Sequence, residues 1–464
     1  MDFFTGAKRN SVIAFIYKLP LVVKTYHFIV SILGACIYGF PSRKIYVIGV
    51  TGTKGKTTTL ELLNSILESA GEKTAMISSV RVKVGGQGKS NDTDNTMPGR
   101  FFIQRFLRRA VDSRCTVALV EVTSQGAALF RHRFIEWDIG VITNIEPEHT
   151  EAHGSFEAYR DSKLAFLTYV LKKRGTVFIN KSDNNSQFFI NVLKNEKVVV
   201  LYSRESANMQ NLLARPGISK KPTNLPPEFI LSDFNKDNIA SAEAVARYLK
   251  ITENVVEDGV RNFSGVPGRM EFVWRGSKTV VIDYAHTPES LEAVYKALKL
   301  LSQESWAKSH GSVASPALIC VLGSAGGGRD KWKRPVLGKI AAQYCSTVIL
   351  TSEDPYDEDP NQILSEIKSG ISPPKAPARP SGGDPPLAEN NQPVRTDVHP
   401  GGFSTSNVEE ILDRGEAIRR AVSYAKDGDI VVITGKGSEQ WIHGPHGAKI
   451  PWSERKAVDD ALRL

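Results

Sequence analysis

Apolar positions in the first half of the chain follow two alternating patterns, short continuous runs and longer stretches at helical spacing. The short runs predict buried strands, and the helical spacing predicts helices that cover them. Strands are expected at 47–50, 116–122, 139–145, 176–180 and 198–202, and helices at 58–70 and 235–249. Such alternation is typical of a parallel sheet whose functional loops lie at the carboxyl ends of the strands.

The same alternation begins again near residue 279. Strands are expected at 279–283, 317–322, 347–351 and 429–434, and helices at 288–301, 334–343 and 408–426. Between 371 and 406 the chain is crowded with Pro, Gly, Ser and Asn and lacks apolar periodicity, which predicts a disordered surface insertion. The α/β chain is therefore expected to comprise a hydrophobic and basic N-terminal segment at 1–43, a central domain with a mostly parallel sheet at 44–266, and a smaller Rossmann-like domain at 267–464.

The first predicted strand runs into a glycine-rich turn that is followed by a helix. Its spacing, from Gly49 to Gly55-Lys56-Thr57, fits G-x(5)-G-K-T, which has one more residue between the glycines than the common phosphate-binding loop. Backbone N–H groups of such a loop converge on phosphate oxygens, while Lys56 adds charge and the Thr57 hydroxyl can bind magnesium. The central domain is thus predicted to be a P-loop ATPase domain, and an ordinary glycine turn is the weaker alternative. The expected nucleotide contacts in this loop are Gly52, Thr53, Lys54, Gly55, Lys56, Thr57 and Thr58.

Composition and charge agree with a globular protein that handles anions. Of the 464 residues, 41% are apolar and 23% are charged, which is ordinary for an α/β protein and excludes a mostly disordered chain. The net charge of +9 suits nucleotides, and it would also suit a membrane surface. Because no aromatic and basic nucleic-acid module is visible, no nucleic-acid partner is expected.

The N-terminal segment and the cysteines bear on location. The uninterrupted apolar part, 28–40, is shorter than the roughly 20 residues that a membrane-spanning helix needs. Two interpretations stay open, a helix packed on the central domain and an interfacial membrane anchor. Cytoplasmic location is expected, because an ATP site follows too closely for a secretory signal. Four widely spaced cysteines are expected to be buried, small apolar residues in a reducing compartment: Cys36, Cys115, Cys320 and Cys345.

Further motifs follow the phosphate-binding loop along the chain. They are EVTSQG, TNIEPEH, Tyr159-x-x-x-Lys163, FNKDNIASA, GVPGRME, DYAHTPESLE, LGSAGGGRDKWKRP, SEDP and TGKGSE. In the first of them, Glu121 ends a strand where its carboxylate can approach a magnesium ion held by Thr57. Together these strings, from about Lys44 to about Trp441, resemble the Mur ligases, the ATP-dependent amide-bond ligases of peptidoglycan synthesis, and most closely their tripeptide synthetase branch.

The resemblance implies a reaction. ATP phosphorylates a substrate carboxylate, and the amine of an amino acid then attacks the acyl phosphate. Lys56 and Thr57 are expected to hold the β/γ-phosphates and a first Mg²⁺, which Glu121 shares, and His149 is expected to hold a second Mg²⁺. Lys163 matches the lysine that the family carbamylates, since a carbamate offers oxygens to magnesium and an ammonium does not. A solvated helix lysine is the plain alternative for Lys163.

Other implied contacts concern the rest of the nucleotide and the two substrates. Arg269 is expected at the γ-phosphate, and other nucleotide contacts are expected from Asn144, Asn235, Asn238, Asp283 and His286. The carboxylate acceptor is expected at Thr96, Thr123, Ser124 and Arg131, and the amino acid at Arg329, Lys331, Asp354, Tyr356, Gly437 and Glu439. In the family's selector, Asp-Asn-Pro-Arg, an arginine grips the far carboxylate of diaminopimelate. Tyr356 stands at that place here and offers no bidentate cation, which disfavours diaminopimelate.

The N-terminus departs from the family pattern. About forty-five residues precede the loop, too few for the separate UDP-binding domain of a complete tripeptide synthetase. The acceptor is therefore expected to be a muramoyl peptide whose uridine part, if present, is bound weakly, or to be another carboxylate, including a lipid-linked one. Two alternatives are a folylpolyglutamate synthase-like or other polyglutamyl ligase and a non-catalytic ATP-dependent switch subunit. A monomer is expected, with peripheral membrane contact through the N-terminal segment left open.

Overall fold

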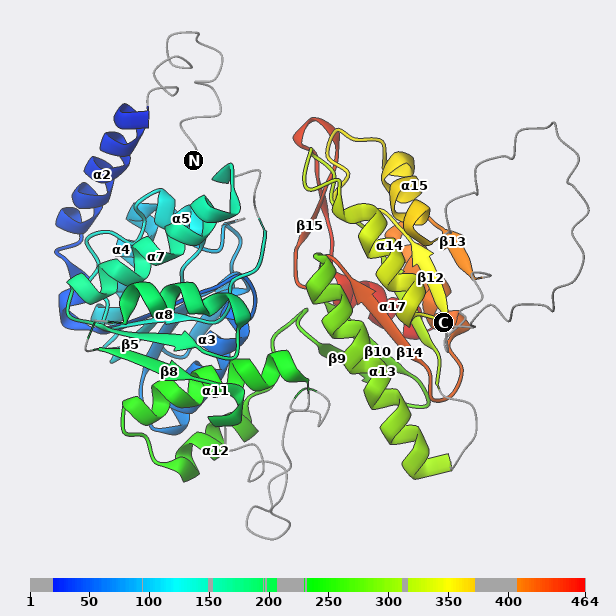
Figure 1. Cartoon of the computed structure of the whole chain (residues 1–464), viewed down its shortest axis with the longest axis horizontal. Coiled ribbons are helices and arrows are strands. Elements are labelled where there is room, and N and C mark those ends of the chain that lie inside the picture. The colour runs from blue at the N-terminus through cyan, green and yellow to red at the C-terminus, as the bar shows by residue number, and fades with distance from the viewer. Residues whose placement is uncertain are drawn as a thin grey trace, which may run out of the picture. The chain divides into compact units, whose positions relative to one another are not determined.

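The structure of the protein is a computed structural model. It describes residues 20–93, 95–148, 153–194, 196, 198–206, 229, 232–310, 316–371 and 407–463, and of residues 20–22, 24 and 301–310 it describes the backbone alone. The chain divides into two compact units, Met1–Val266 and Pro267–Leu464, here named unit 1 and unit 2. In each unit, helices flank a sheet (Figure 1).

Unit 1 is built on an eight-stranded sheet in the order β4-β3-β2-β5-β1-β6-β7-β8. It is parallel from β2 to β8, and β3 and β4 extend it in antiparallel fashion. The strands are β1 (Tyr46–Thr51), β2 (Thr74–Ile77), β3 (Arg81–Val84), β4 (Gln87–Ser90), β5 (Val117–Glu121), β6 (Ile139–Ile142), β7 (Thr176–Asn180) and β8 (Val199–Tyr202). The predicted mostly parallel sheet is confirmed.

The helices of unit 1 lie on both faces of this sheet (Figure 1). They are α2 (Pro20–Ile37), α3 (Lys56–Ser69), α4 (Arg100–Asp112), α5 (Ser124–Ala128), α7 (Phe156–Lys172), α8 (Gln187–Leu193), α11 (Asp233–Tyr248) and α12 (Glu253–Asn262), with 3-10 turns η2 (Pro41–Lys44), η3 (Asn184–Ser186) and η4 (Arg204–Ser206). The core requires a glycine in β1, because a Cβ at Gly49 would collide with the rings of Phe166 and Trp137. Those rings meet edge to face at 5.1 Å.

Helix α2 packs on α4 on one side and is exposed on the other. The Ser31 hydroxyl donates to the carbonyl of Phe130 at 3.0 Å, and the rings of Phe28 and Phe134 lie 5.1 Å apart. Packing on the domain, one of the two interpretations of this segment, is therefore observed. Across the described part of the chain, no helix has the length and apolar character needed to cross a membrane.

Unit 2 is built on a six-stranded sheet in the order β13-β12-β11-β14-β10-β9, parallel except for the β9–β10 pair, and a separate two-stranded hairpin. The strands are β9 (Glu271–Arg275), β10 (Thr279–Asp283), β11 (Leu318–Leu322), β12 (Thr347–Leu350), β13 (Val408–Glu410), β14 (Ile430–Thr434), β15 (Trp441–His443) and β16 (Lys449–Pro451). The helices are α13 (Pro288–His310), α14 (Lys333–Tyr344), α15 (Pro360–Ile371), α16 (Arg414–Tyr424) and α17 (Glu454–Leu462), with the 3-10 turn η5 (Pro445–Gly447). The expected C-terminal α/β domain is confirmed.

The helix predicted at 408–426 is wrong at its beginning. Residues 408–410 form β13, which pairs with β12, and α16 begins only at Arg414. The Asp413 side chain accepts a hydrogen bond from the Glu416 backbone at 2.7 Å and so caps α16. Residues 372–406, most of the predicted insertion, lie outside the described residues.

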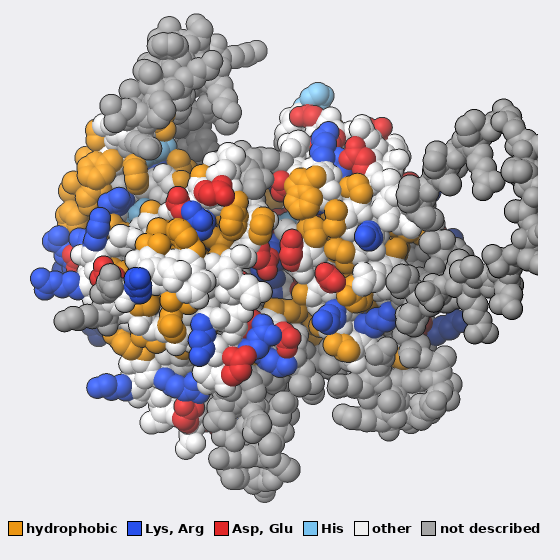
Figure 2. Space-filling model, in the orientation of Figure 1, with side chains coloured by type: hydrophobic (Ala, Val, Ile, Leu, Met, Phe, Trp, Pro, Cys, Tyr) orange, Lys and Arg blue, Asp and Glu red, His pale blue; other side chains and the backbone are white. Residues whose placement is uncertain are grey.

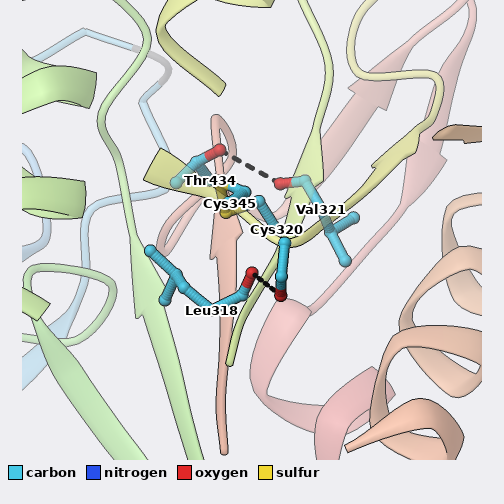
Figure 3. Close-up of a disulfide and its surroundings, with 6 residues drawn as sticks. Leu318, Cys320, Val321, Cys345 and Thr434 are labelled. Atoms are coloured by element: carbon cyan, nitrogen blue, oxygen red, sulfur yellow. Dashed lines mark hydrogen bonds between the residues drawn. A yellow bond between two sulfur atoms is a disulfide. The ribbon is translucent and has the colours of Figure 1, made fainter. Parts of the chain in front are cut away.

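The expectation for the cysteines is also wrong in part. Cys320 in β11 and Cys345, directly after α14, form a disulfide with a Cα–Cα distance of 6.0 Å (Figure 3). Both are buried, whereas Cys36 is exposed and Cys115 alone is a buried thiol. The chain leaves α14 and enters β12 beside β11, which brings Cys345 back to Cys320 across 25 residues. Spacing along the sequence does not reveal this return.

Candidate active site

The phosphate-binding loop lies at the carboxyl ends of three neighbouring strands of unit 1. β1 is parallel to β5 on one side and to β6 on the other, with Val50 opposite Glu121 and Thr51 opposite Ile142. The loop after β1, Glu121 of β5 and Asn144 after β6 therefore reach the same edge of the sheet. This is the edge at which open parallel sheets bind ligands.

Glycines and Asn144 fix the shape of this loop. Gly52 has φ +146° and Gly55 has φ +79°, and a Cβ at Gly55 would collide with the side-chain oxygen of Asn238. The Asn144 side-chain oxygen accepts from the backbone N–H of Thr53 at 3.2 Å and of Lys54 at 2.8 Å. Asn144 thus contacts the loop itself, and Gly55 is the N-cap of α3.

Thr57 and Glu121 lie together, as a shared magnesium site requires. The Thr57 hydroxyl donates to a Glu121 carboxylate oxygen at 3.0 Å, and the Ser79 backbone N–H donates to the same oxygen at 2.9 Å. Both side chains are buried. A hydroxyl and a carboxylate beside a phosphate-binding loop are hard oxygen ligands of the kind that Mg²⁺ prefers, so the residues fit this ion. In the described part of the chain, no group of three or more His, Cys, Asp or Glu residues gathers as a metal site.

Lys163 is buried beside the same loop. Its side chain is 1% exposed, and its Nζ donates to the Gly52 carbonyl at 2.8 Å and lies 4.4 Å from the Tyr159 ring centroid. Burial, above all, and the neighbouring Lys56 lower the pKa of Lys163 well below its ordinary value, and Lys54 adds to this, whereas Glu148 opposes it. A solvated helix lysine is therefore not what the structure has at this position.

The remaining cations of the loop are paired or bonded. Lys54 forms an ion pair with Glu148 at 3.0 Å, and Lys56 donates to the carbonyls of Gly52 and Thr53 at 3.1 and 2.9 Å. Thr58 is buried in the first turn of α3. His149, the expected ligand of a second metal, lies outside the described residues.

Two asparagines of α11 lie at the other side of the loop. Asn238 donates to the Asn235 side-chain oxygen at 3.1 Å, and Thr59 donates to Asn238 at 3.4 Å. Both asparagines are buried, and the Asn235 amide nitrogen has no hydrogen-bond partner among the described residues. Buried amides are rarely left unpaired. Their position against Gly55 agrees with the expected nucleotide role.

The residues expected to bind the acceptor lie around the short helix α5. Thr123 is its N-cap and accepts from the Gly126 backbone at 3.0 Å. Ser124 is 3.1 Å from Nε2 of His153, whose pKa is lowered by burial and by Lys163. Arg131 donates to the carbonyl of Met97, which follows Thr96. Ser124 is thus linked through His153 to the surroundings of Lys163.

In unit 2, Arg269 and its neighbours gather on Tyr284. The Arg269 guanidinium lies 3.9 Å from the Tyr284 ring centroid, and the tyrosine hydroxyl donates to Glu439 at 2.9 Å. The Asp283 carboxylate accepts from the backbone of Met270 and Ala285, at 2.7 Å each, and thereby orders the turns that carry Arg269 and His286. The ring of His286 lies 4.7 Å from that of Tyr284.

The residues expected to bind the amino acid form a second cluster of unit 2. Lys436 donates to Asp354 at 2.8 Å and to Glu439 at 2.5 Å, and the ring of Tyr356 stacks on His443 at 5.3 Å. Arg329 donates to the Tyr356 hydroxyl at 2.9 Å. A guanidinium thus lies beside the tyrosine that replaces the selector arginine, although it comes from another loop.

The remaining residues expected to bind the amino acid, Lys331 and Gly437, have different surroundings. Lys331 pairs with Glu358 at 3.1 Å, and Arg334, from the same GRDKWKRP motif, is fully buried and pairs with Glu358 and Glu366. Gly437 has φ +54° and packs on Tyr284 and the backbone of Gly268. Sequence reasoning missed Ser79, Tyr284, Lys436 and His443. Lys436 and Tyr284 stand inside quoted motifs and could have been found there, whereas Ser79 and His443 carry no local signal.

Fold and site together define a two-unit P-loop enzyme in which the phosphate-binding unit carries a buried lysine. Residues 50–239 match the Mur ligase middle domain, and residues 268–437 match the Mur ligase glutamate ligase domain. The chain belongs to the Mur ligase family, and it is an ATP-dependent ligase that forms carbon–nitrogen bonds.

Two curated relatives of the chain share one name. The chain is 30% identical to the UDP-N-acetylmuramoyl-L-alanyl-D-glutamate--2,6-diaminopimelate ligase of Geobacillus kaustophilus, over 95% of this chain and 85% of that protein. It is 33% identical to the protein of the same name from Synechococcus elongatus, over 88% and 75%.

Solved structures are also similar to this chain. A ligase of that name is 26% identical with a TM-score of 0.52, covering 90% of this chain and 78% of the other. A folylpolyglutamate synthase/dihydrofolate synthase from Yersinia pestis, with AMPPNP and Mn ion, has a TM-score of 0.59 at 18% identity, covering 95% and 93%. The second likeness shows the fold alone.

Proposed function

We propose that this ligase attaches an amino acid to the carboxylate of a muramoyl peptide, with ATP and Mg²⁺. An oxygen of that carboxylate attacks the γ-phosphorus of ATP, ADP leaves, and an acyl phosphate forms. The amine of the amino acid then attacks the acyl carbon, phosphate leaves, and the amine loses a proton to solvent. The relatives named as diaminopimelate ligases support this acceptor class, and the residues of the loop suit the charge that the first step develops.

The observation that carries the proposal is the burial of Lys163 beside the loop, together with its lowered pKa. Burial and the neighbouring cations favour the neutral amine of Lys163, and a neutral amine is a nucleophile whose nitrogen adds to CO₂ to give a carbamate with loss of one proton. In that form the side chain would present oxygens beside Lys56 and Lys54 and could serve a second Mg²⁺. Bound magnesium would neutralise the charge that accumulates between the phosphate and the carboxylate.

Each remaining residue of unit 1 has a proposed task. Lys56 and the loop N–H groups hold the β- and γ-phosphates, and Thr57 with Glu121 holds one Mg²⁺. Asn235 and Asn238 bind the adenine side, where the orphaned Asn235 amide can donate. Thr96, Thr123, Ser124 and Arg131 position the acceptor.

The test is phosphate release from ATP with purified protein. We expect release only when a muramoyl peptide and an amino acid are both present, with diaminopimelate, lysine and glutamate compared as amines. Release that needs no acceptor or amine would indicate a switch subunit, and a response to folate in place of the muramoyl peptide would indicate a polyglutamyl ligase. Arg269→Lys should slow release strongly, because a lysine cannot present the planar fork of a guanidinium.

We further propose a monomeric, cytoplasmic protein that contacts membranes through α2. Apolar side chains are exposed along α2 and at the start of α4: Tyr26, Phe28, Ile29, Leu33, Ile37 and Phe101 (Figure 2, upper left). Exposed cations lie nearby, at Arg43, Lys44, Arg105 and Arg109. Such a surface suits anionic lipid. Wild type should float with vesicles that contain anionic lipid, and Leu33→Ser combined with Ile37→Ser should reduce flotation. Equal flotation of both proteins would contradict this role.

A further inference from the structure

A serine and a histidine of unit 1 are paired at the proposed acceptor site. Oγ of Ser124 lies 3.1 Å from Nε2 of His153, which is 29 residues further along the chain. Ser124 is the first residue of α5, directly after the N-cap Thr123, and is only 5% exposed. Among the described residues, no other side chain is bonded to the Ser124 hydroxyl, so its oxygen can accept a further hydrogen bond.

Tyr159 links this histidine to the phosphate-binding loop. Its ring lies edge to face with the ring of His153, at a centroid distance of 5.5 Å. The same ring lies 4.4 Å from Nζ of Lys163, and its hydroxyl is 2.9 Å from Oγ1 of Thr53 in the loop. Because Tyr159 is 1% exposed, these contacts are made in the interior of unit 1. The Ser124–His153 pair is therefore next to the loop that the proposed function assigns to the γ-phosphate.

The amide-forming step needs a group that removes a proton. When an amine attacks an acyl carbon, its nitrogen becomes positively charged, and the amide is reached only when that nitrogen loses a proton. A neutral imidazole suits this task, because the ordinary pKa of histidine, about 6.5, leaves most rings neutral above pH 7. A serine hydroxyl that donates to such a ring can accept a proton at its oxygen while it passes its own to the ring. Other carboxylates near the loop are engaged elsewhere, since Glu148 is paired with Lys54 and Glu121 is bonded to Thr57.

We propose that Ser124 and His153 form a proton relay for amide formation. As the amine nitrogen bonds to the acyl carbon, it gives a proton to Oγ of Ser124, and the hydroxyl proton of Ser124 passes to Nε2 of His153. The bond from the acyl carbon to the phosphate oxygen breaks, phosphate leaves with that electron pair, and the imidazolium releases its proton to solvent. This inference rests on the proposed function, which places the acceptor carboxylate at Ser124, and it adds the route by which the amine proton reaches solvent.

Two nucleophiles separate a proton relay from a structural contact. Hydroxylamine and an amino acid attack the same acyl phosphate, but the weakly basic nitrogen of hydroxylamine, once bonded to the acyl carbon, loses its proton readily to water. In His153→Gln the side-chain amide can still bond to the Ser124 hydroxyl but cannot take up a proton. With a muramoyl peptide and whichever of diaminopimelate, lysine and glutamate wild type uses fastest, we expect kcat to fall roughly 100-fold or more. Hydroxamate formation and the KM of the muramoyl peptide should stay within about twofold of wild type.

The matched control is His446→Gln, the same substitution at a side chain of unit 2 that is 96% exposed, and it should leave both rates unchanged. Imidazole in the buffer should restore amide formation to His153→Ala and leave its hydroxamate formation unchanged. Equal losses of amide and hydroxamate formation in His153→Gln, or undiminished amide formation, overturn the relay. Wild-type protein that forms no hydroxamate with the muramoyl peptide overturns the proposed acceptor as well, and because this result needs no variant, the two failures are distinguishable.

Discussion

Among the residues that the structure describes, each unit has one completely buried lysine, and the groups around the two lysines carry opposite charge. Lys163 of unit 1 is bonded to the Gly52 carbonyl, near Lys56 and Lys54, whereas Lys436 of unit 2 is bonded to Asp354 and Glu439. Burial lowers the pKa of both. At Lys436 the two carboxylates outweigh burial and raise the pKa, while at Lys163 burial and the neighbouring cations depress it well below the ordinary value. Burial alone therefore does not decide the charge of a lysine; the partners that share its site decide it.

The difference separates a reactive group from a structural one. Lys436 is a permanent cation that holds the Asp354 loop against the loop after β14, and its nitrogen lone pair is not available. At Lys163 burial and the neighbouring cations favour the neutral amine, whose lone pair is available, at a cost in stability that folding must offset elsewhere. If the proposed function holds, unit 1 carries the lysine that would be carbamylated, and unit 2 carries a fixed ion pair network at the proposed amino-acid site.

The largest expected effect is loss of activity in Lys163→Met. If Lys163 is a carbamate that serves a metal, its removal should lower kcat at least 10³-fold, about 4 kcal/mol of transition-state stabilisation. Lys172→Met, at an exposed position of the same helix, should stay within twofold of wild type. The measurement is phosphate release in buffers with and without bicarbonate. Wild-type activity that is indifferent to bicarbonate would contradict the carbamate.

The next effect concerns Lys436. Lys436→Met leaves Asp354 and Glu439 without their cation, and removal of one partner from a buried ion pair costs about 3 kcal/mol of unfolding free energy. Urea unfolding followed by circular dichroism measures this loss. Lys456→Met, on the exposed side of α17, should change it by less than about 0.5 kcal/mol. A stable Lys436→Met protein would mean that this lysine is not the structural one.

Sequence reasoning succeeded where one local pattern carries the information. The glycine loop, Glu121 at the end of β5 and the buried runs of β7 and β10 follow from spacing and apolar periodicity, and the parallel sheet follows from their alternation. The charge state of Lys163 could not be predicted in this way, because it depends on Gly52, Lys56 and Glu148, which the fold brings together over about a hundred residues. The same holds for the Tyr356–His443 stack.

The two units also differ in covalent cross-linking. Unit 2 has the Cys320–Cys345 disulfide, whereas Cys36 and Cys115, in the described part of unit 1, are free thiols. Closing a loop of 25 residues stabilises a fold by about 3 kcal/mol. Cys345→Ala should therefore lower the unfolding free energy of unit 2 by that amount, and Cys36→Ala should not. Calorimetry with and without a reductant measures the difference, and an unchanged midpoint on reduction would show that the bond contributes little.

The smallest effect is the contribution of Lys163 to the pH dependence of stability. Its folded pKa lies well below the unfolded value of 10.5, so between these two values the unfolded chain binds one proton more than the folded chain. Stability must then rise as pH increases through this window and fall as pH decreases through it. Lys163→Met removes that slope, so it should be more stable than wild type at pH 8, and the gap should narrow towards pH 10.5. Lys436→Met should keep the wild-type slope, because its lysine is charged in both states. Urea titrations in bicarbonate-free buffer provide the measurement, and identical slopes in wild type and Lys163→Met would show that Lys163 is protonated in the folded protein, which would remove the basis for its carbamylation.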